Sequence, residues 1–247
     1  MSKSKFITEY TVDIDRCGPN TNLGLIGTCN IIQSLSTNHA FELGIGAFDL
    51  KERGGYWVIT NTQIEFYNDA NLYETLIGET WPMASKPTDF KTYRSHIIRR
   101  NKDIIAKAKT EWVVLSTKNN MPLQFKDAGF PGKYKFIDET ALAIEPSKFV
   151  NDFDDNDKIG EYIISPTDID LAVHTNNVKY VKIFLDTFTL DELKNKKPKY
   201  FEIKYASSCL LGEKVSIYKK IEENTYRYAI KNSSGKVTTY AKIEFKN

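Results

Sequence analysis

Hydrophobic and polar positions follow the same order in the two halves of the chain. In the first half, residues 21–43 place apolar side chains at near-helical spacing with polar residues between them. Glycines at positions 44 and 46 follow, as expected where a helix ends. In the second half, residues 176–188 also place their apolar side chains on one helical face. The pattern therefore predicts one helix in each half.

Runs rich in β-branched and aromatic residues follow each predicted helix and are typical of antiparallel strands joined by tight turns. The runs of the first half are Tyr56–Phe66, Glu74–Trp81, Thr92–Arg99 and Ile104–Leu115. The runs of the second half are 199–207, 214–221, 225–231 and 236–245. We therefore expect a helix followed by a four-strand meander, formed twice as a weak internal duplication.

Residues 118–159 separate the two halves and are rich in Lys, Asn, Pro and Gly. This composition predicts a long connector that crosses the surface. The expected organisation is a first half at 1–117, a connector at 118–159 and a second half at 160–247. A helix wrapped by a long curved antiparallel sheet, made twice in one chain, is the α+β layout of a tandem double hot-dog protein.

Composition narrows the class of protein. Among 247 residues, 34 Lys and Arg nearly balance 32 Asp and Glu, which argues against a nucleic-acid partner. No run approaches the roughly 18 apolar residues of a membrane span, and no apolar run follows the N-terminal lysines, so no secretory signal is expected. Three widely spaced cysteines without a CxxC pair, and three unpaired histidines, indicate reduced thiols and no metal site. A soluble, cytoplasmic protein is expected.

The segment Ser165–Tyr180 carries the most specific pattern, with the sequence SPTDIDLAVHTNNVKY. It resembles the signature of the acyl-acyl-carrier-protein thioesterases of plants and bacteria. In that family a strand ends in D-x-D-x-N-x-H-x-N-N/S-x-x-Y and continues into a buried helix. The resemblance covers nearly the whole chain and implies a double hot-dog fold that hydrolyses fatty acyl thioesters.

Thioester hydrolysis needs a water nucleophile, a group that takes its proton and donors for the developing oxyanion. A helix N-terminus offers free N–H groups, and Thr175 or Asn176 could cap it. His174 precedes this terminus, and Asp170 is near enough in sequence to orient His174 or a water molecule. Spacing alone favours the interpretation that Asp170 and Asn176 merely satisfy the turn and the helix cap. The resemblance implies that Asp170 and His174 belong to the catalytic network.

The chain departs from the family pattern at two positions. Ala172 stands where the family has an asparagine, and Ser208 aligns with a glutamate, with Cys209 beside it. Hydrolysis could persist at a reduced rate with Asp170 and His174 acting on water. Alternatively, Cys209 could be a nucleophile activated by His174. The site could also be inactive, with the fold retained to bind an acyl chain or its carrier.

The resemblance places the acyl chain in the first half of the molecule. Candidate lining residues are Phe41, Trp57, Ile59, Phe66 and Trp81, although each could instead be plain core. The implied substrate is fatty acyl-acyl carrier protein, hydrolysed without a cofactor to end chain elongation, and a coenzyme A thioesterase is the alternative. An acidic carrier protein would favour a basic docking surface, for which Lys194, Lys196, Lys197 and Lys199 are candidates. A monomer is plausible because the second half replaces a partner subunit, and a homodimer is the other expectation.

Overall fold

The computed structural model describes residues 4–129 and 136–247, which form one ten-stranded antiparallel sheet. The strands of the first half are β1 (Phe6–Thr11), β2 (Gly55–Phe66), β3 (Thr75–Pro82), β4 (Lys91–Arg100) and β5 (Asp103–Ser116). Those of the second half are β6 (Lys158–Ile163), β7 (Pro198–Tyr205), β8 (Lys214–Glu222), β9 (Thr225–Lys231) and β10 (Val237–Phe245).

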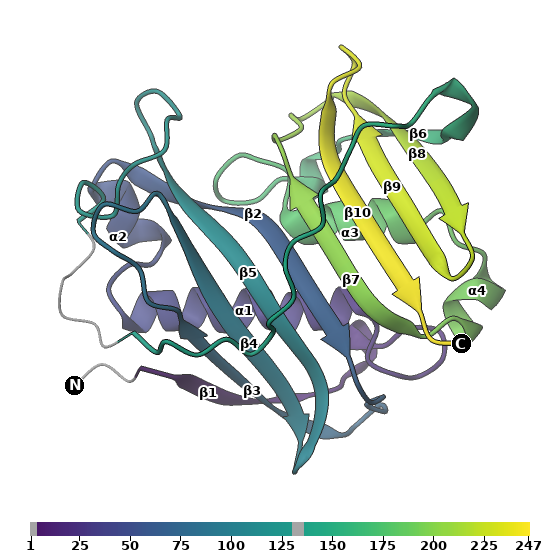
Figure 1. The fold of residues 1–247 in the computed structure, drawn as a ribbon, viewed down its shortest axis with the longest axis horizontal. Coiled ribbons are helices and arrows are strands. Elements are labelled where there is room, and N and C mark those ends of the chain that lie inside the picture. Colours follow the sequence, from purple (N-terminus) through teal and green to yellow (C-terminus); the bar gives the residue numbers. More distant parts are fainter. Residues whose placement is uncertain (1–3, 130–135) are drawn as a thin grey trace.

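The second half repeats the strand order of the first half in reverse, starting from the centre of the sheet. The first half contributes β1-β3-β4-β5-β2, and the second continues with β7-β10-β9-β8-β6. The halves meet where Asn61–Glu65 of β2 pairs antiparallel with Tyr200–Lys204 of β7. The duplication predicted from the sequence is therefore built into a single sheet (Figure 1).

Two helices lie on one face of this sheet and contact each other, α1 (Leu25–Glu42) under the first half and α3 (Asn177–Leu185) under the second. Leu35 and Ile64 pack with Phe184 and Phe201 in one core that extends across both halves. Shorter helices follow each of them, α2 (Ala47–Glu52) and α4 (Leu190–Asn195). Three 3₁₀ turns complete the elements: η1 (Ile14–Arg16), η2 (Asp155–Asp157) and η3 (Pro166–Asp168). No helix within the described ranges is both long and apolar enough to cross a membrane.

The structure confirms the α+β class, both predicted helices and all eight predicted strands. In each half the last three predicted strands form the expected meander, β3-β4-β5 and β8-β9-β10, but the predicted place of the first strand is wrong. β2 pairs with β5 rather than with β3, and β7 pairs with β10 rather than with β8. After β2 the chain continues to β3, which is separated from β2 in the sheet by β5 and β4. There β3 pairs with β1, a strand that was not predicted. β1 and β6 are six-residue edge strands with alternating exposed residues, so they carry little hydrophobic signal.

The connector crosses the face of the sheet opposite the helices (Figure 1), and residues 136–154 contain no helix or strand. Glu202 of β7 is fully buried beneath it. Its carboxylate accepts hydrogen bonds from the Ser147 N–H and hydroxyl, from Asn61 of β2 and from the Tyr200 hydroxyl. These bonds fasten the connector at the junction of the halves. The boundaries 1–117, 118–159 and 160–247 stay a prediction; β6 begins at Lys158, inside the predicted connector.

Candidate active site

Asp168 anchors the loop that carries the sequence motif. Its buried carboxylate accepts hydrogen bonds of 2.8 Å each from the Tyr162 hydroxyl, the Ser165 hydroxyl and the Ser165 N–H. Burial by itself raises the pKa of Asp168, but the bonds from Ser165 and Tyr162 outweigh it and hold the pKa below its ordinary value. The first aspartate of the motif is thus a structural anchor that stays ionised.

The next residues form a tight hairpin that presents Asp170 and His174. The Asp170 N–H donates to the His174 carbonyl at 2.9 Å, and the Val173 N–H donates to the Asp170 carbonyl at 3.0 Å. The Asp170 carboxylate accepts the Ala172 N–H at 2.9 Å, which fixes its direction. Val173 has a φ of 61°, a left-handed conformation that costs a β-branched residue about 1–2 kcal/mol. The loop is held in a shape that its sequence alone would not favour.

Helix α3 begins directly after this hairpin. Asn176 is its N-cap, because the side-chain oxygen accepts the Val178 N–H at 2.9 Å. The Asn176 N–H donates to the Asp168 carbonyl. Among the described residues, the Asn177 N–H has no hydrogen-bond acceptor. A free donor therefore stands at the positive end of the helix, suited to polarise a carbonyl oxygen.

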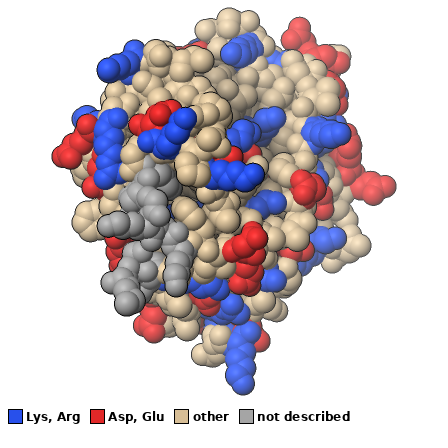
Figure 2. All heavy atoms as spheres, turned by 60° about the vertical axis from the view of Figure 1, so that its left-hand side comes forward, with Lys and Arg blue, Asp and Glu red and all other residues tan. Residues whose placement is uncertain are grey.

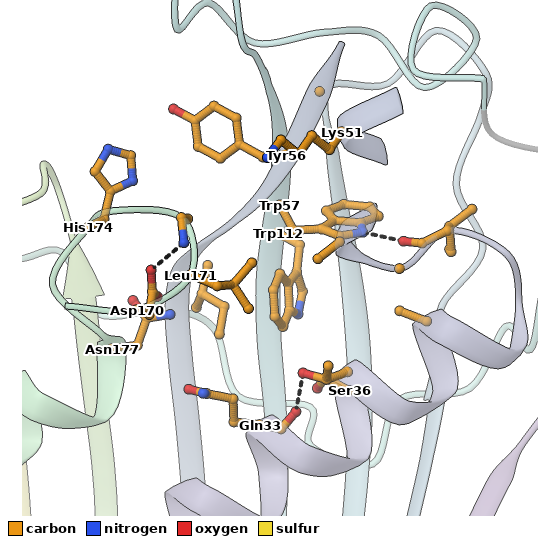
Figure 3. Close-up of a pocket in the computed structure, with 18 of the residues that line it drawn as sticks. Gln33, Ser36, Lys51, Tyr56, Trp57, Trp112, Asp170, Leu171, His174 and Asn177 are labelled. Atoms are coloured by element: carbon orange, nitrogen blue, oxygen red, sulfur yellow. Dashed lines mark hydrogen bonds between the residues drawn. The ribbon is translucent and has the colours of Figure 1, made fainter. Parts of the chain in front are cut away.

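The motif loop closes one side of a cavity of about 520 Å³ that lies in the first half. The cavity runs between α1 and the inner face of β2, β5 and β4, with Trp57, Ile59 and Trp112 among its apolar walls. Figure 3 shows His174 and Tyr56 above these two tryptophans, with Leu171 between the loop and Trp112. Asp170, His174, Asn176 and Asn177 all line this cavity. The second half thus supplies polar groups to an apolar pocket of the first.

His174 packs against Tyr56, with ring centroids 5.8 Å apart and planes tilted by 46°. The Tyr56 hydroxyl donates to the Asn120 side chain at 3.2 Å. The structure forms no hydrogen bond between the side chains of Asp170 and His174, although both face the same cavity. Catalytic hydrogen bonds often tighten only when substrate is bound.

The predicted lining residues divide into two groups. Trp57 and Ile59 line the cavity, whereas Phe41, Phe66 and Trp81 do not. Phe41 is 72% exposed. Phe66 lies seven residues beyond Ile59 along β2, about 23 Å away, and packs against the core instead. Trp81 is fully buried and donates its indole N–H to the Glu139 carbonyl of the connector, so it faces the opposite side of the sheet.

Cys209 lies outside the cavity. Its thiol is fully buried and lies 3.3 Å from the Thr238 hydroxyl, and burial raises its pKa. Its main chain is clamped by the motif, since its N–H donates to the Tyr180 hydroxyl and its carbonyl accepts the Thr175 hydroxyl, both at 2.8 Å. The structure therefore does not bring Cys209 to His174 as a nucleophile would require.

The two departures from the family pattern occupy different places. Ala172 lines the cavity, so its methyl group stands among the polar groups of the motif. Ser208 is exposed, donates its hydroxyl to the Cys209 carbonyl and is not part of the cavity wall.

Several cavity residues escaped the sequence analysis: Gln33, Lys51, Arg94, Trp112, Asn120 and Asn177. Five of them lie outside the motif, Gln33 on α1, Lys51 on α2, Arg94 on β4, Trp112 on β5 and Asn120 after β5, whereas Asn177 belongs to the motif and begins α3. Arg94 is a charged residue of which only 6% is exposed.

Charged groups elsewhere are dispersed. Within the described ranges, no three His, Cys, Asp or Glu side chains gather where a metal ion could bind. Figure 2 shows Lys and Arg interspersed with Asp and Glu over one face of the molecule. The lysines at 194–199 extend from the last turn of α4 into the start of β7, beyond the C-terminal end of α3, whereas the motif lies at the N-terminal end of α3. That cluster is therefore about one helix length from the cavity mouth, roughly 14 Å or more.

Comparison with known proteins agrees with this fold and with the motif found in the second half. Two family models match the chain, the acyl-ACP thioesterase N-terminal domain over residues 3–129 and the acyl-ACP thioesterase C-terminal domain over residues 152–247. The chain belongs to the acyl-ACP thioesterase family. This confirms the resemblance read from Ser165–Tyr180.

Individual relatives are distant in sequence and similar in fold. A chloroplastic dodecanoyl-[acyl-carrier-protein] hydrolase of Cinnamomum camphora is 24% identical over 211 residues, which are 78% of this chain and 53% of that protein. The chain thus spans about half the length of the curated relatives it matches. The structure of an acyl-ACP thioesterase from Bacteroides thetaiotaomicron has a TM-score of 0.86 at 20% identity, covering 98% of both chains. The 12:0-ACP thioesterase of Umbellularia californica has a TM-score of 0.85 at 18% identity, covering 100% of this chain and 95% of that one.

Proposed function

We propose that the protein hydrolyses the thioester of fatty acyl-acyl carrier protein and releases a free fatty acid. One observation carries the proposal: Asp170, His174 and the N-terminus of α3 line the same cavity as an apolar wall that fits an acyl chain. The names of the relatives, which are acyl-carrier-protein hydrolases, favour this carrier over coenzyme A. A cytoplasmic location, and a monomer or homodimer, stay predictions.

The reaction follows from these positions. The acyl chain enters the pocket and places its carbonyl oxygen at the Asn177 N–H, where the helix end stabilises negative charge. Asp170 orients a water molecule and His174 takes its proton as the oxygen bonds to the carbonyl carbon. The carbon–sulfur bond then breaks, and His174 returns the proton to the departing thiolate. The products are a fatty acid and the carrier thiol.

The shortened polar network supports a second candidate function. The methyl group of Ala172 supplies no dipole to the reacting centre, and loss of one such polar group costs about 10²–10³-fold in rate. A protein with reduced or no turnover could still bind the acyl chain or the acyl carrier protein. Cys209 offers no substitute nucleophile, because its thiol is buried away from the cavity.

Fatty acid release from acyl-carrier-protein and acyl-coenzyme A substrates tests the proposal. We expect turnover with the carrier-protein substrates and a loss of about 10²–10³-fold in His174→Ala, because a general base is removed. Thr167→Ala, an exposed change in the same segment, is the matched control and should leave the rate unchanged. Equal rates in His174→Ala and the wild type would refute the proposed site.

The second candidate predicts a different result. Tight binding of acyl carrier protein without turnover, together with a gain in rate on Ala172→Asn, would identify a binding protein that has lost its chemistry. Faster turnover of acyl-coenzyme A would instead reassign the carrier.

A further inference from the structure

Gln33 differs from the other polar residues on the face of α1 that lines the cavity. That face consists of Gln33, Ser36, Thr37 and Ala40. The Ser36 hydroxyl donates to the Ile32 carbonyl and the Thr37 hydroxyl to the Gln33 carbonyl, each at 2.9 Å, so both hydroxyls are bonded within their own helix. The side-chain amide of Gln33 forms no hydrogen bond with the described residues and is not among the enclosed polar atoms that lack a partner. Its N–H groups are therefore available to a molecule in the cavity.

Gln33 lies where α1 meets α3. The two helices contact each other, and a second cavity of about 20 Å³ at this contact is lined by Gln33, Ile59 and Asn177, among others. The same three residues line the main cavity. Figure 3 shows the Gln33 amide directed toward the side of the pocket on which Asp170 and Asn177 lie. The first half thus brings a side-chain amide to the groups that the motif supplies.

The backbone of Gln33 is held by the core. Ile32 and Leu35, on either side of Gln33 in α1, are buried in the hydrophobic core that both halves share. A functional group carried by a packed helix is positioned more precisely than one carried by a loop. The main chain of Gln33 is therefore fixed relative to α3, and only its side-chain torsions adapt to a substrate.

The N-terminus of α3 has few donors left for a developing oxyanion. The Asn176 N–H donates to the Asp168 carbonyl, and the Val178 N–H donates to the Asn176 side chain. Of these successive backbone donors, the Asn177 N–H is left for the substrate. The oxyanion of an acyl-transfer intermediate is typically held by two donors, which can be backbone N–H groups or side-chain amides. Ala172 lines the same cavity but brings only a methyl group. The second donor therefore has to be another side chain.

We propose that Gln33 is a catalytic residue whose side-chain N–H donates to the acyl carbonyl oxygen beside the Asn177 N–H. The inference deepens the proposed function and rests on it for the identity of the carbonyl. When the water oxygen bonds to the carbonyl carbon, one electron pair of the C=O bond moves onto the oxygen, and the two N–H groups stabilise that charge. The pair re-forms the C=O bond as the carbon–sulfur bond breaks and its electrons leave with the thiolate. Gln33 neither gains nor loses a proton in either step.

Steady-state hydrolysis by the full chain tests the catalytic role. Gln33→Leu keeps a similar volume without a donor, and we expect kcat to fall by about 10²–10³-fold with little change in KM, because the bond strengthens as charge develops. Gln33→Glu keeps the length but replaces the donor by a carboxylate, so it should lose at least as much, and it serves if Gln33→Leu fails to fold. Asn38→Leu also replaces an amide by leucine, on the exposed face of α1, and should keep the wild-type rate.

A bound ketone separates the contact from catalysis. The probe is an S-acyl pantetheine analogue in which a methylene replaces the thioester sulfur, with an isotope-labelled carbonyl, and its C=O stretch is measured by infrared spectroscopy. Hydrogen bonds weaken the C=O bond and lower this frequency. The frequency should therefore be higher in Gln33→Leu than in the wild type, and Asn38→Leu should match the wild type.

The outcomes separate this inference from the proposed function. Equal kcat and equal frequency in Gln33→Leu and the wild type would overturn the inference. A loss of rate in Asn177→Ala without a loss in Gln33→Leu would also overturn it and assign the second donor to the Asn177 side chain. A frequency difference without turnover in the wild type would reject the proposed function alone.

Discussion

The two halves of the molecule share a strand order and differ in what lies between helix and sheet. Under α3, the space is filled by packed aromatic rings, with centroid separations of 4.9 Å for Phe184 and Tyr228 and 5.0 Å for Tyr226 and Phe245. Between α1 and its sheet, the same space contains the cavity of about 520 Å³. Duplication thus allows one copy to be solid and to hold the motif rigidly, while the other is hollow and can accept a chain.

The difference can be traced to one helix face. Gln33, Ser36, Thr37 and Ala40 line the cavity and follow each other at helical spacing, so α1 presents small or polar side chains to the pocket. Leu35, between them in sequence, is fully buried in the shared core. Helix α3 instead presents Phe184 to its sheet. Side-chain volume on a single face decides which half is hollow.

Opening the filled half should have the largest effect. Phe184→Ala removes a fully buried ring and is expected to lower the free energy of unfolding by about 3–5 kcal/mol, measured by denaturant titration. Phe48→Ala, at a position that is 76% exposed, is the control and should change stability little. Similar losses for both variants would contradict the view that the second half is held by its aromatic core.

Filling the hollow half is the converse change. Ala40→Trp places an indole in the cavity and should reduce fatty acid binding and turnover by about 100-fold, because the chain has no room. The neighbouring Phe41→Trp points to solvent and should bind as the wild type does. Binding that survives in Ala40→Trp would mean that the chain occupies another part of the molecule.

The smallest effect is expected at Cys209, on the filled side. Cys209→Ala should change turnover by less than about tenfold, since a true nucleophile would cost about 10⁴-fold or more. Burial raises the thiol pKa, so the group stays protonated at neutral pH and becomes a thiolate only as the pH exceeds that raised value. Alkylation rates followed against pH check this directly. Rapid alkylation at neutral pH that abolishes turnover would restore the nucleophile hypothesis.

The local sequence pattern predicted most helices and strands but not how the strands pair. Period and composition marked both long helices and the eight longer strands, whereas β1 and β6 are too short to stand out. The order of strands depends on which strand edges meet in space. No local feature of the sequence therefore indicates that β2 pairs with β5. The motif marked Asp170 and His174 through their family resemblance.

The pocket was harder to predict than the motif. Strand alternation puts Trp57 and Trp81 in equivalent-looking positions, and only the tertiary arrangement turns one toward α1 and the other toward the connector. Arg94 is buried, and nothing in the sequence around it indicates the burial of a charged residue. A stripe of small and polar residues along a predicted helix, such as Gln33 to Ala40, is the signal that could have located the cavity.

The pairing of β2 with β7 also bears on what either half would do alone. A fragment ending before the connector would expose the backbone groups of Asn61–Glu65, which now bond to Tyr200–Lys204. An open strand of this kind is a template for another chain. A two-fold rotation would place β2 of a second, identical fragment antiparallel to β2 of the first. The first half expressed alone should therefore form a homodimer. The covalent link between the halves therefore takes the place of a subunit interface. Because the two linked halves need not be identical, the first half can contain a cavity while the second half stays filled.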